Sequence, residues 1–585
     1  MSEVKLESME EETTDVSITT VSEPPARVPG MTGSPAMSAQ ELERIARRYA
    51  GLEPEKRAAF RKKAAQLGIS YRNFPVVPIA SRERRLPLTY AQERLWFLWK
   101  LDPASPAYNI TRAVRLEGTL DVQAVREGVS ALVLRHASLR TRFEECDGVA
   151  AQIVDAAGEY VWAEYDLSAL PEATRDAEQR KRLAQLSVEP FDLERGELLR
   201  VALLTVGHGR YVLHFAVHHI VADGGSLGLL TQEFGRAYDA MCSGRPIDLE
   251  ALPAQYADYA LWQREWLDGE ALEGQLAYWR KQLGSSDAVL ELPGKKLSAG
   301  LRSARGGRIG KIVPASLAVQ LRQLARRHRV TLPTLLNAAY CLLLSRYAGQ
   351  RDVRVGVPVA GRNRAGTEQL IGFFVNTLVL RADLGTVDTL RELLAQIDRS
   401  MAEAQSHQDL PFARLVDALR PERSLGETPL FQAMFNYSTE SIQALALPGL
   451  TISPVREDAE TARFDLVLNV VDSEELDVAF NYALDRFERA TVERLLAHYL
   501  EVLAQFGCAD ELDLGAVALS VDRRWKDVRS EHEFTPVMNR ISERASQMGE
   551  ARAVVCEDES LSYAKLEAWS NRIGRRLKTL GVRAA

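Results

Sequence analysis

The sequence predicts an α/β protein built from two similar halves. Strand-like runs rich in branched apolar residues alternate with stretches whose apolar residues recur every three or four positions, which is the pattern of amphipathic helices. The chain has 585 residues, more than one hydrophobic core usually holds, so two large lobes with extensions are expected. With 46% hydrophobic and 26% charged residues, its composition is that of an ordinary soluble globular protein.

Charge and composition exclude several classes of partner. The formal net charge is −7, so the basic excess that favours binding to a phosphate backbone is missing, and nucleic acid is not an expected partner. No stretch approaches the roughly 18 consecutive apolar residues of a membrane helix, so no membrane span is expected. The five cysteines have no metal-ligand spacing, and the N-terminus has no apolar signal region. These features predict a reduced, cytoplasmic protein that binds no metal.

The first 80 residues divide into two segments. Residues 1–35 are predicted to be a disordered acidic tail, because residues 1–32 carry seven acidic and two basic side chains and few large apolar groups. Residues 36–80 are predicted to be a helical linker or docking segment, with a capping box at Ser38 and a second helix starting at Pro54. This pair of helices is basic. It is either a solvated linker or a surface that docks an upstream protein.

The remaining elements follow in order along the two halves. In the first half, a strand at 113–118 precedes a helix at 121–136, and a strand at 212–217 precedes a helix at 227–240. In the second half, helices are expected at 316–328, 332–347 and 389–406, and strands at 353–359 and 376–380.

The turn after the strand at 212–217 carries a pattern that suits catalysis. Residues 218–224 read HHIVADG, and strand alternation directs His218 and His219 to opposite faces, so one can reach a cleft while the other supports the structure. His219 is the candidate reactive group. Asp223 is well placed to hold the turn by an ion pair or a local hydrogen bond.

The residues after Asp223 favour access to the turn. Gly224 and Gly225 let a substrate backbone or a pantetheine arm approach, and a helix starting near Ser226 directs its N–H groups at the site. Two other interpretations stand beside this one. The histidines could simply pack or hydrogen-bond, and a zinc site is disfavoured because no histidine pair stands four apart on a helix and no cysteine is close.

Seven stretches of sequence, this turn among them, resemble the condensation domain of nonribosomal peptide synthetases. The resemblance covers roughly residues 86–521. In the family's order, the matching stretches are residues 88–97, 135–143, 218–224, 256–263, 371–377, 407–412 and 463–466.

A second resemblance concerns the C-terminal part. Residues 561–566 (LSYAKL) are similar to the first signature of an adenylation domain. Residues 526–585 are therefore predicted to be a linker and the start of a truncated adenylation domain.

The main resemblance implies a fold and an activity. The fold is two chloramphenicol-acetyltransferase-like lobes in a V-shaped pseudo-dimer, at residues 81–265 and 266–525, with the HHxxxDG turn at the floor of a tunnel between them. The activity is amide formation between a donor acyl or peptidyl thioester and the amine of an acceptor aminoacyl thioester. Donor and acceptor peptidyl carrier proteins, which present substrates on phosphopantetheine, and a downstream adenylation domain are the expected partners. No cofactor is expected to bind directly.

The resemblance and the residue chemistry together suggest individual roles. His219 is expected to orient the amine and accept its proton, and His218 to support it. Asp223 is expected to be structural, with Arg140 as the first candidate for its partner and Arg362 as the second. The candidates for lining the tunnel are Gly225, Ser226 and Asn376, with a strand-capping role equally open for Asn376.

Two subtypes remain. Heterocyclising, epimerising and dual relatives are set aside because both histidines are present, an adenylation start follows and no second His-His run stands near the start. Ordinary condensation of an L-configured donor is the broader class and is preferred.

The alternative is starter condensation, which attaches a fatty acyl group from acyl-CoA or an acyl carrier protein. Because the chain opens at Met1 without a carrier domain before the lobes, the donor is expected to arrive in trans under either subtype. Gly225 stands where the family often has Trp, and the missing side chain slightly favours a long acyl donor. A stand-alone CoA-dependent acyltransferase and a silent scaffold are less favoured.

Overall fold

A computed structural model describes residues 37–580 apart from short gaps. The gaps are residues 68, 80–84, 285–288, 296–304, 420–428, 440–446, 456–461, 474, 509–510, 521–536 and 557–558. The chain divides into two compact units, with the boundary in sequence between Ala518 and Leu519. The acidic tail predicted at residues 1–35 lies outside the described residues. None of the described helices combines the length and apolar character that crossing a membrane requires.

The first lobe is built on a five-stranded sheet with the order β12-β2-β7-β6-β5. Neighbouring strands run antiparallel, except that β5 is parallel to β6. A separate three-stranded sheet has the order β1-β4-β3. The strands are β1 (Leu86–Pro87), β2 (Asn109–Gly118), β3 (Thr141–Cys146), β4 (Val149–Val154), β5 (Val161–Asp166), β6 (Leu199–Gly207), β7 (Arg210–His218) and β12 (Leu450–Pro454).

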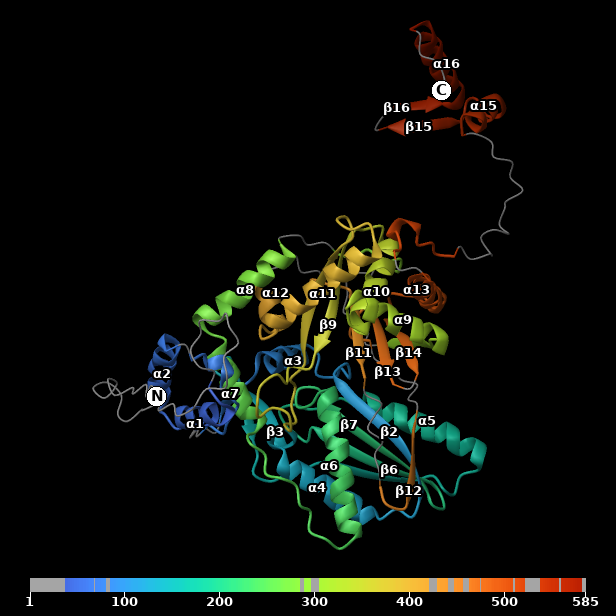
Figure 1. Cartoon of the computed structure of the whole chain (residues 1–585). Helices are drawn as coiled ribbons and strands as arrows, with labels where there is room; N and C mark the ends of the chain where they lie inside the picture. The colour runs from blue at the N-terminus through green and yellow to red at the C-terminus, as the bar shows by residue number, and fades with distance from the viewer. Residues whose placement is uncertain are drawn as a thin grey trace. The chain divides into compact units, whose positions relative to one another are not determined.

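Helices cover both faces of the five-stranded sheet (Figure 1). The cluster on one face includes Val201, Leu203 and Leu213 and packs against α4 and α6, whereas Leu204 and Val212 on the other face pack with Leu183 of α5. The alternation of apolar side chains along each strand thus supplies two cores. The helices are α3 (Tyr90–Leu101), α4 (Val122–Arg135), α5 (Glu172–Val188), α6 (Gly224–Cys242) and α7 (Tyr256–Trp266).

The second lobe repeats this plan with a six-stranded sheet of order β10-β9-β11-β13-β14-β8. Among its helices, α10 is buried along most of its length, which its run of apolar residues explains. The strands are β8 (Gly306–Ile312), β9 (Asp352–Val359), β10 (Asn376–Asp383), β11 (Ala433–Ser438), β13 (Leu466–Asp472) and β14 (Leu476–Ala483). The helices are α8 (Gly269–Leu283), α9 (Ala315–His328), α10 (Leu332–Ala348), α11 (Leu390–Ser406), α12 (Phe412–Leu419) and α13 (Arg489–Cys508).

The two predicted α/β lobes are confirmed, and the chain exchanges a strand between them. β12, from the second half of the sequence, pairs antiparallel with β2 of the first lobe, so that Leu450 faces Gly118. Gly118 has a φ of +136°, and a Cβ there would lie 2.2 Å from the Gly449 carbonyl oxygen. Only glycine allows this close approach.

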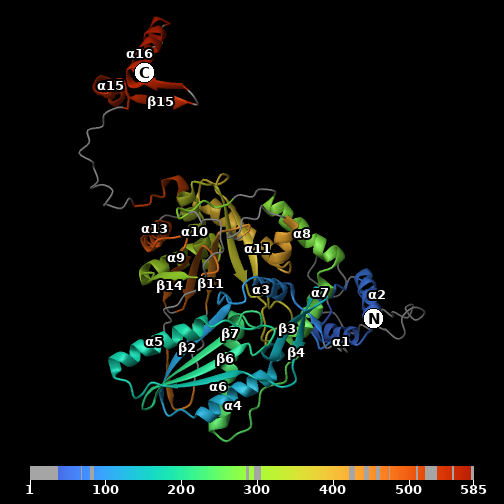
Figure 2. The same ribbon diagram turned by 180° about the vertical axis from the view of Figure 1, so that it is seen from behind.

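The N-terminal helices α1 (Ala39–Ala50) and α2 (Pro54–Gln66) are packed into the first unit and are not held out in solvent. Figure 2 shows them on the side of the lobe that carries α7. The capping box predicted at Ser38 forms with Glu41. Apolar side chains of α1 join a cluster with Trp262 of α7. A solvated linker is therefore not the arrangement that this segment adopts.

One carboxylate on α7 joins these helices to the lobe. Glu265 accepts hydrogen bonds from the hydroxyls of Tyr49 at 2.5 Å and Tyr71 at 3.1 Å, and from Arg57 at 3.2 Å. Burial and the neighbouring Glu265 raise the pKa of Tyr49 well above its ordinary value, so its hydroxyl stays a donor.

Glu265→Ala is expected to loosen α1 and α2 by about 2–3 kcal/mol, because Arg57 keeps a buried charge without its partner. Hydrogen exchange followed by mass spectrometry should show faster exchange confined to residues 39–66. Glu43→Ala, which breaks an exposed pair with Arg47 on α1, is the matched control and should change exchange little. Equal protection in the Glu265→Ala protein would contradict this role.

The second unit is a small α/β piece. Its elements are α15 (Val537–Gln547), β15 (Arg552–Cys556), β16 (Glu559–Ser562) and α16 (Tyr563–Thr579). α16 buries none of its residues, and Trp569, Ile573 and Leu577 form a stripe at helical spacing that is 44–52% exposed. This unit thus presents a half-exposed apolar helix face.

Candidate active site

His218 closes β7 and faces the interior of the first lobe. It is 3% exposed, and its Nδ1 accepts a hydrogen bond from the Ile220 N–H at 3.1 Å. Because Nδ1 is an acceptor, the neutral ring carries its proton on Nε2. Burial, and then the charge of Arg463, lower the pKa of His218 to about 3. His218 is therefore a buried, neutral side chain that is hydrogen-bonded within the turn.

His219 is the first residue beyond β7 and is only partly buried. Its backbone N–H donates to the Tyr108 carbonyl at 2.9 Å, and its ring packs edge-on against Phe373, with centroids 4.7 Å apart. The buried Nδ1 has no hydrogen-bond partner among the described residues. Burial, followed by the charge of Arg463, holds the pKa of His219 well below its ordinary value. The imidazole is thus neutral at physiological pH.

Asp223 lies at the N-terminus of α6 and uses both carboxylate oxygens to join the two lobes. Oδ1 accepts from the Ser226 N–H and hydroxyl, both at 2.8 Å, and from Arg362 Nη2 at 3.0 Å. Oδ2 accepts from the N–H groups of Phe374 at 2.9 Å and Val375 at 3.3 Å. The side chain is 1% exposed. Both carboxylate oxygens are thus taken up by hydrogen bonds within the turn and between the lobes.

Residues 361–375, which link β9 to β10, are called the crossing segment because they reach from the second lobe to this helix terminus. The Gly372 N–H donates to the Ser226 hydroxyl at 3.1 Å, and the Tyr256 hydroxyl donates to the Phe373 carbonyl at 2.6 Å. A Cβ at Gly372 would lie 1.9 Å from the Tyr256 ring. Glycine in the 371–377 signature is therefore explained by close packing between lobes.

Several predicted site residues occupy other places than expected. Arg140 was the first candidate for pairing with Asp223, and this prediction is wrong, because its guanidinium donates to the Asp155 carbonyl. The second candidate, Arg362, is confirmed as the partner. Ser226 is fully buried, and its hydroxyl is engaged between the lobes, so it does not line a cavity.

The glycines at the start of α6 are exposed. The helix begins at Gly224, three residues earlier than predicted, because Asp223 and not a later residue caps it. A Cβ at Gly224 would meet nothing within 4 Å. At Gly225 it would lie 3.2 Å from Arg362 Nε, so Arg362 borders the space that the missing tryptophan was expected to leave.

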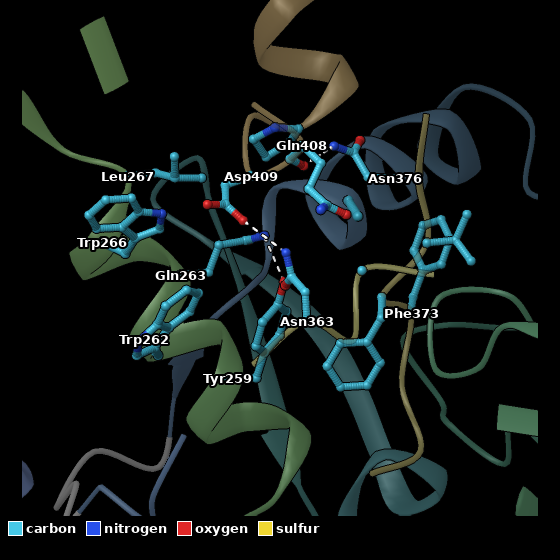
Figure 3. Close-up of a pocket in the computed structure, with 15 residues that line it drawn as sticks. Tyr259, Trp262, Gln263, Trp266, Leu267, Asn363, Phe373, Asn376, Gln408 and Asp409 are labelled. Carbon is cyan, nitrogen blue, oxygen red and sulfur yellow. Dashed lines mark hydrogen bonds between the residues drawn. The ribbon is translucent and has the colours of Figure 1, made fainter. Parts of the chain in front are cut away.

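A small, partly open pocket lies beside the crossing segment. Figure 3 shows Tyr259, Trp262 and Trp266 on one side and Asn376 on the other. Phe373 also lines this pocket and is the side chain that packs on His219, so it separates the two.

Asn376 has two kinds of contact here. It lines the pocket, and it fixes the start of β10 by donating to the carbonyls of Gln408 at 2.9 Å and Leu410 at 2.7 Å. Its Oδ1 accepts the Phe412 N–H at 3.0 Å.

Arg463 is a neighbour of the histidines that sequence reasoning did not single out. It stands three residues before β13 of the second lobe, yet its Nε donates to the Ala107 carbonyl of the first lobe at 2.9 Å. Its guanidinium lies over the Tyr108 ring, 5.5 Å from the centroid. In the sequence, only its place in the 463–466 signature drew attention to Arg463. The spacing of residues could not predict its hydrogen bond to Ala107.

The arrangement combines a neutral imidazole, an adjacent exposed helix terminus and a rigid connection between lobes. A neutral imidazole can accept a hydrogen bond and a proton from an amine. The N–H groups at the start of α6 carry the positive end of the helix dipole. The chemistry that fits is acyl transfer to a nitrogen nucleophile.

Comparisons with known proteins agree with this chemistry. A family model described as "Condensation domain" matches residues 82–516. One of the linear gramicidin synthase proteins of Brevibacillus parabrevis is 40% identical over 523 residues, which are 87% of this chain and 7% of that protein. A dimodular nonribosomal peptide synthase of Bacillus subtilis (strain 168) is 35% identical over 539 residues, covering 89% of this chain and 22% of that protein. The chain thus spans less than a quarter of the length of these relatives.

Among solved structures, the X-domain of teicoplanin biosynthesis, determined in complex with OxyB, superimposes with a TM-score of 0.70 at 26% identity. The match covers 77% of this chain and 99% of that one. A starter condensation domain of rhizomide synthetase, determined with C8-CoA, has a TM-score of 0.65 at 20% identity and supports the fold alone.

Proposed function

This chain belongs to the condensation-domain family of nonribosomal peptide synthetases, and on that premise we propose that His219 handles the proton as a carrier-bound donor thioester is joined to an aminoacyl thioester. The domain is an acyltransferase of the amide-forming class. The observation that carries the assignment is the neutral, partly buried ring of His219, whose Nδ1 has no partner among the described residues.

The proposed step transfers an acyl group from sulfur to nitrogen. The acceptor amine attacks the donor thioester carbon, a C–N bond forms, and the C–S bond breaks as the donor carrier's thiolate leaves. The amine loses one proton to His219, which then delivers it to the leaving sulfur, so atoms and charge balance. The N–H groups of Gly224 and Gly225 lie at the end of α6 where an oxyanion would be stabilised.

The supporting residues act by positioning. We propose that His218 and Asp223 hold the turn, with Arg362 as the second half of the connection, and that the exposed surface at Gly225 and the pocket edge at Asn376 lie along the substrate path. Both substrates would reach the turn on phosphopantetheine arms of donor and acceptor carrier proteins, through a tunnel between the lobes. Tethering both reactants in one passage would supply much of the rate advantage.

The pH dependence of condensation should follow the amine and not the imidazole. His219 has a depressed pKa, so its neutral form is present above that pKa and is lost only when the pH falls well below ~6.5. An α-amino group, with a pKa near ~8, should therefore set the acidic limb.

Single-turnover rates between about pH 5.5 and 8.5 would test this, using two acceptor amines of different basicity. The acidic limb of the pH–rate profile should shift with the pKa of the acceptor amine. A limb near pH ~6.5 that does not depend on the acceptor would show that His219 titrates normally.

The donor is proposed to be an aminoacyl or peptidyl carrier thioester, with a fatty acyl donor as the alternative. The argument for a long acyl chain was that Gly225 leaves space in the tunnel. Arg362 weakens this argument, because its Nε lies 3.2 Å from where a Cβ of residue 225 would stand. The test offers fatty acyl-CoA and an aminoacyl carrier in parallel to a loaded acceptor carrier, with product read by mass spectrometry. Transfer from acyl-CoA alone would reverse the assignment, and transfer from neither would favour a scaffold role.

The second unit is proposed to be the opening of an adenylation domain. Besides the LSYAKL resemblance, the support is the exposed apolar stripe of Trp569, Ile573 and Leu577, a face that suits burial against further chain. A cytoplasmic location completes the proposal. It is supported by free thiols at Cys146, Cys242, Cys341 and Cys508.

A further inference from the structure

A contact between the lobes converges on the backbone that holds His219. The His219 N–H donates to the Tyr108 carbonyl at 2.9 Å, and the preceding carbonyl, that of Ala107, accepts from Arg463 Nε at 2.9 Å. We infer that Arg463 is a positioning residue for His219, fixing the 107–108 backbone from the second lobe while placing a positive charge beside the imidazole.

The geometry gives Arg463 two points of attachment to this short loop. Besides its hydrogen bond to Ala107, its guanidinium lies over the Tyr108 ring at 5.5 Å. The planar, five-donor guanidinium suits simultaneous hydrogen bonding and stacking, which a lysine cannot reproduce in full. Loss of Arg463 would release the loop to which the His219 N–H is hydrogen-bonded.

The charge of Arg463 acts on the protonation of His219. After burial, it is the largest contribution that holds the pKa of His219 low, and it acts in the same direction on His218. An arginine remains protonated at any working pH, so this charge is permanent. A neighbouring cation disfavours imidazolium and so keeps the ring in the form that accepts a proton.

Other charged and titratable groups around the histidines come from each neighbouring element. His218 is neutral, and Asp223 at the start of α6 is balanced by Arg362 of the crossing segment. Arg200 of β6 bears on His218 and is hydrogen-bonded to carbonyls of residues 189–190. Among these groups, Arg463 is the cation whose effect on His219 is direct.

The first measurement follows the imidazole itself. Carbon-13-labelled histidines are titrated by NMR, and the His219→Ala spectrum identifies the His219 signal among the nine histidines. In Arg463→Met, the titration midpoint should move upward from its wild-type position, whereas Arg463→Lys, which keeps the charge, should leave it nearly unchanged. An unmoved midpoint in a folded Arg463→Met protein would overturn the inference. Arg463→Gln serves as a second uncharged variant if the methionine protein does not fold.

The second measurement is the ratio of variant to wild-type condensation rates across pH, in which protonation of the acceptor amine cancels. Because burial still lowers the pKa of His219 in this variant, the pKa should rise only part of the way to ~6.5, and the ratio for Arg463→Met should be lower at pH 6 than at pH 8 by up to about fourfold. For Arg463→Lys the ratio should be constant with pH. A constant ratio for both variants would mean a merely structural role and would overturn the inference.

Arg346→Met is the matched control. Arg346 also reaches a carbonyl, that of Leu514 at 2.6 Å, but it lies on α10 within the second lobe. The ratio of Arg346→Met to wild-type condensation rates should not change with pH. The inference rests on the proposed role of His219, and the two can fail separately. Full activity in His219→Ala would overturn that role, while the NMR titration would still decide whether Arg463 controls the imidazole.

Discussion

His219→Ala is expected to lower the rate of carrier-to-carrier amide formation by at least ~100-fold, because it removes the imidazole placed to take the proton at the turn. The fold should survive, since His219 Nδ1 has no hydrogen-bond partner among the described residues and the backbone bond to Tyr108 does not depend on the side chain. Initial rates and thermal unfolding of the same preparation separate the two effects.

His208→Ala is the matched control, because His208 is exposed in the turn between β6 and β7 of the same lobe. Its rate should stay at the wild-type value. A loss smaller than about threefold in His219→Ala, with intact folding, would mean that tethering and orientation perform the reaction without a base.

Asp223→Ala is expected to destabilise the protein by about 3–5 kcal/mol. The substitution leaves the Arg362 guanidinium with an unpaired charge in a largely buried site, and it orphans the N–H groups of Phe374 and Val375. Loss of soluble protein, or a large shift of the urea midpoint, is the expected result.

A surface ion pair supplies the control for this measurement. Asp239 pairs with Arg245 at 2.6 Å, with both side chains about half exposed, so Asp239→Ala should cost less than about 1 kcal/mol. An Asp223→Ala protein that folds with wild-type stability but makes no product would instead indicate a direct role in the reaction.

The local structure around the site could be predicted because it depends on short-range pattern. The strand, the histidine turn and the following helix were all expected, and β7 and α6 differ from the prediction only at their ends. Ser38 and its capping box were found for the same reason, since a cap is fixed within four residues.

Contacts between lobes could not be predicted, because apolar period and spacing say nothing about which distant segments meet. Arg140 was the first candidate for the partner of Asp223 and Arg362 the second, and only the path of the crossing segment decides for Arg362. For the same reason, the sequence could not predict that β12 pairs with the first sheet or that Arg463 donates to the Ala107 carbonyl. The burial that lowers the pKa of His218 and His219 also depends on the assembled lobes.

The most direct test of the central claim is intact-mass spectrometry of both carrier proteins after a single turnover. We expect the acceptor carrier to gain the mass of the donor's acyl group while the donor carrier returns as a free thiol, and this transfer to be nearly lost in His219→Ala. Equal transfer by the wild-type and His219→Ala proteins, or release of the acyl group to water without gain on the acceptor, would contradict it.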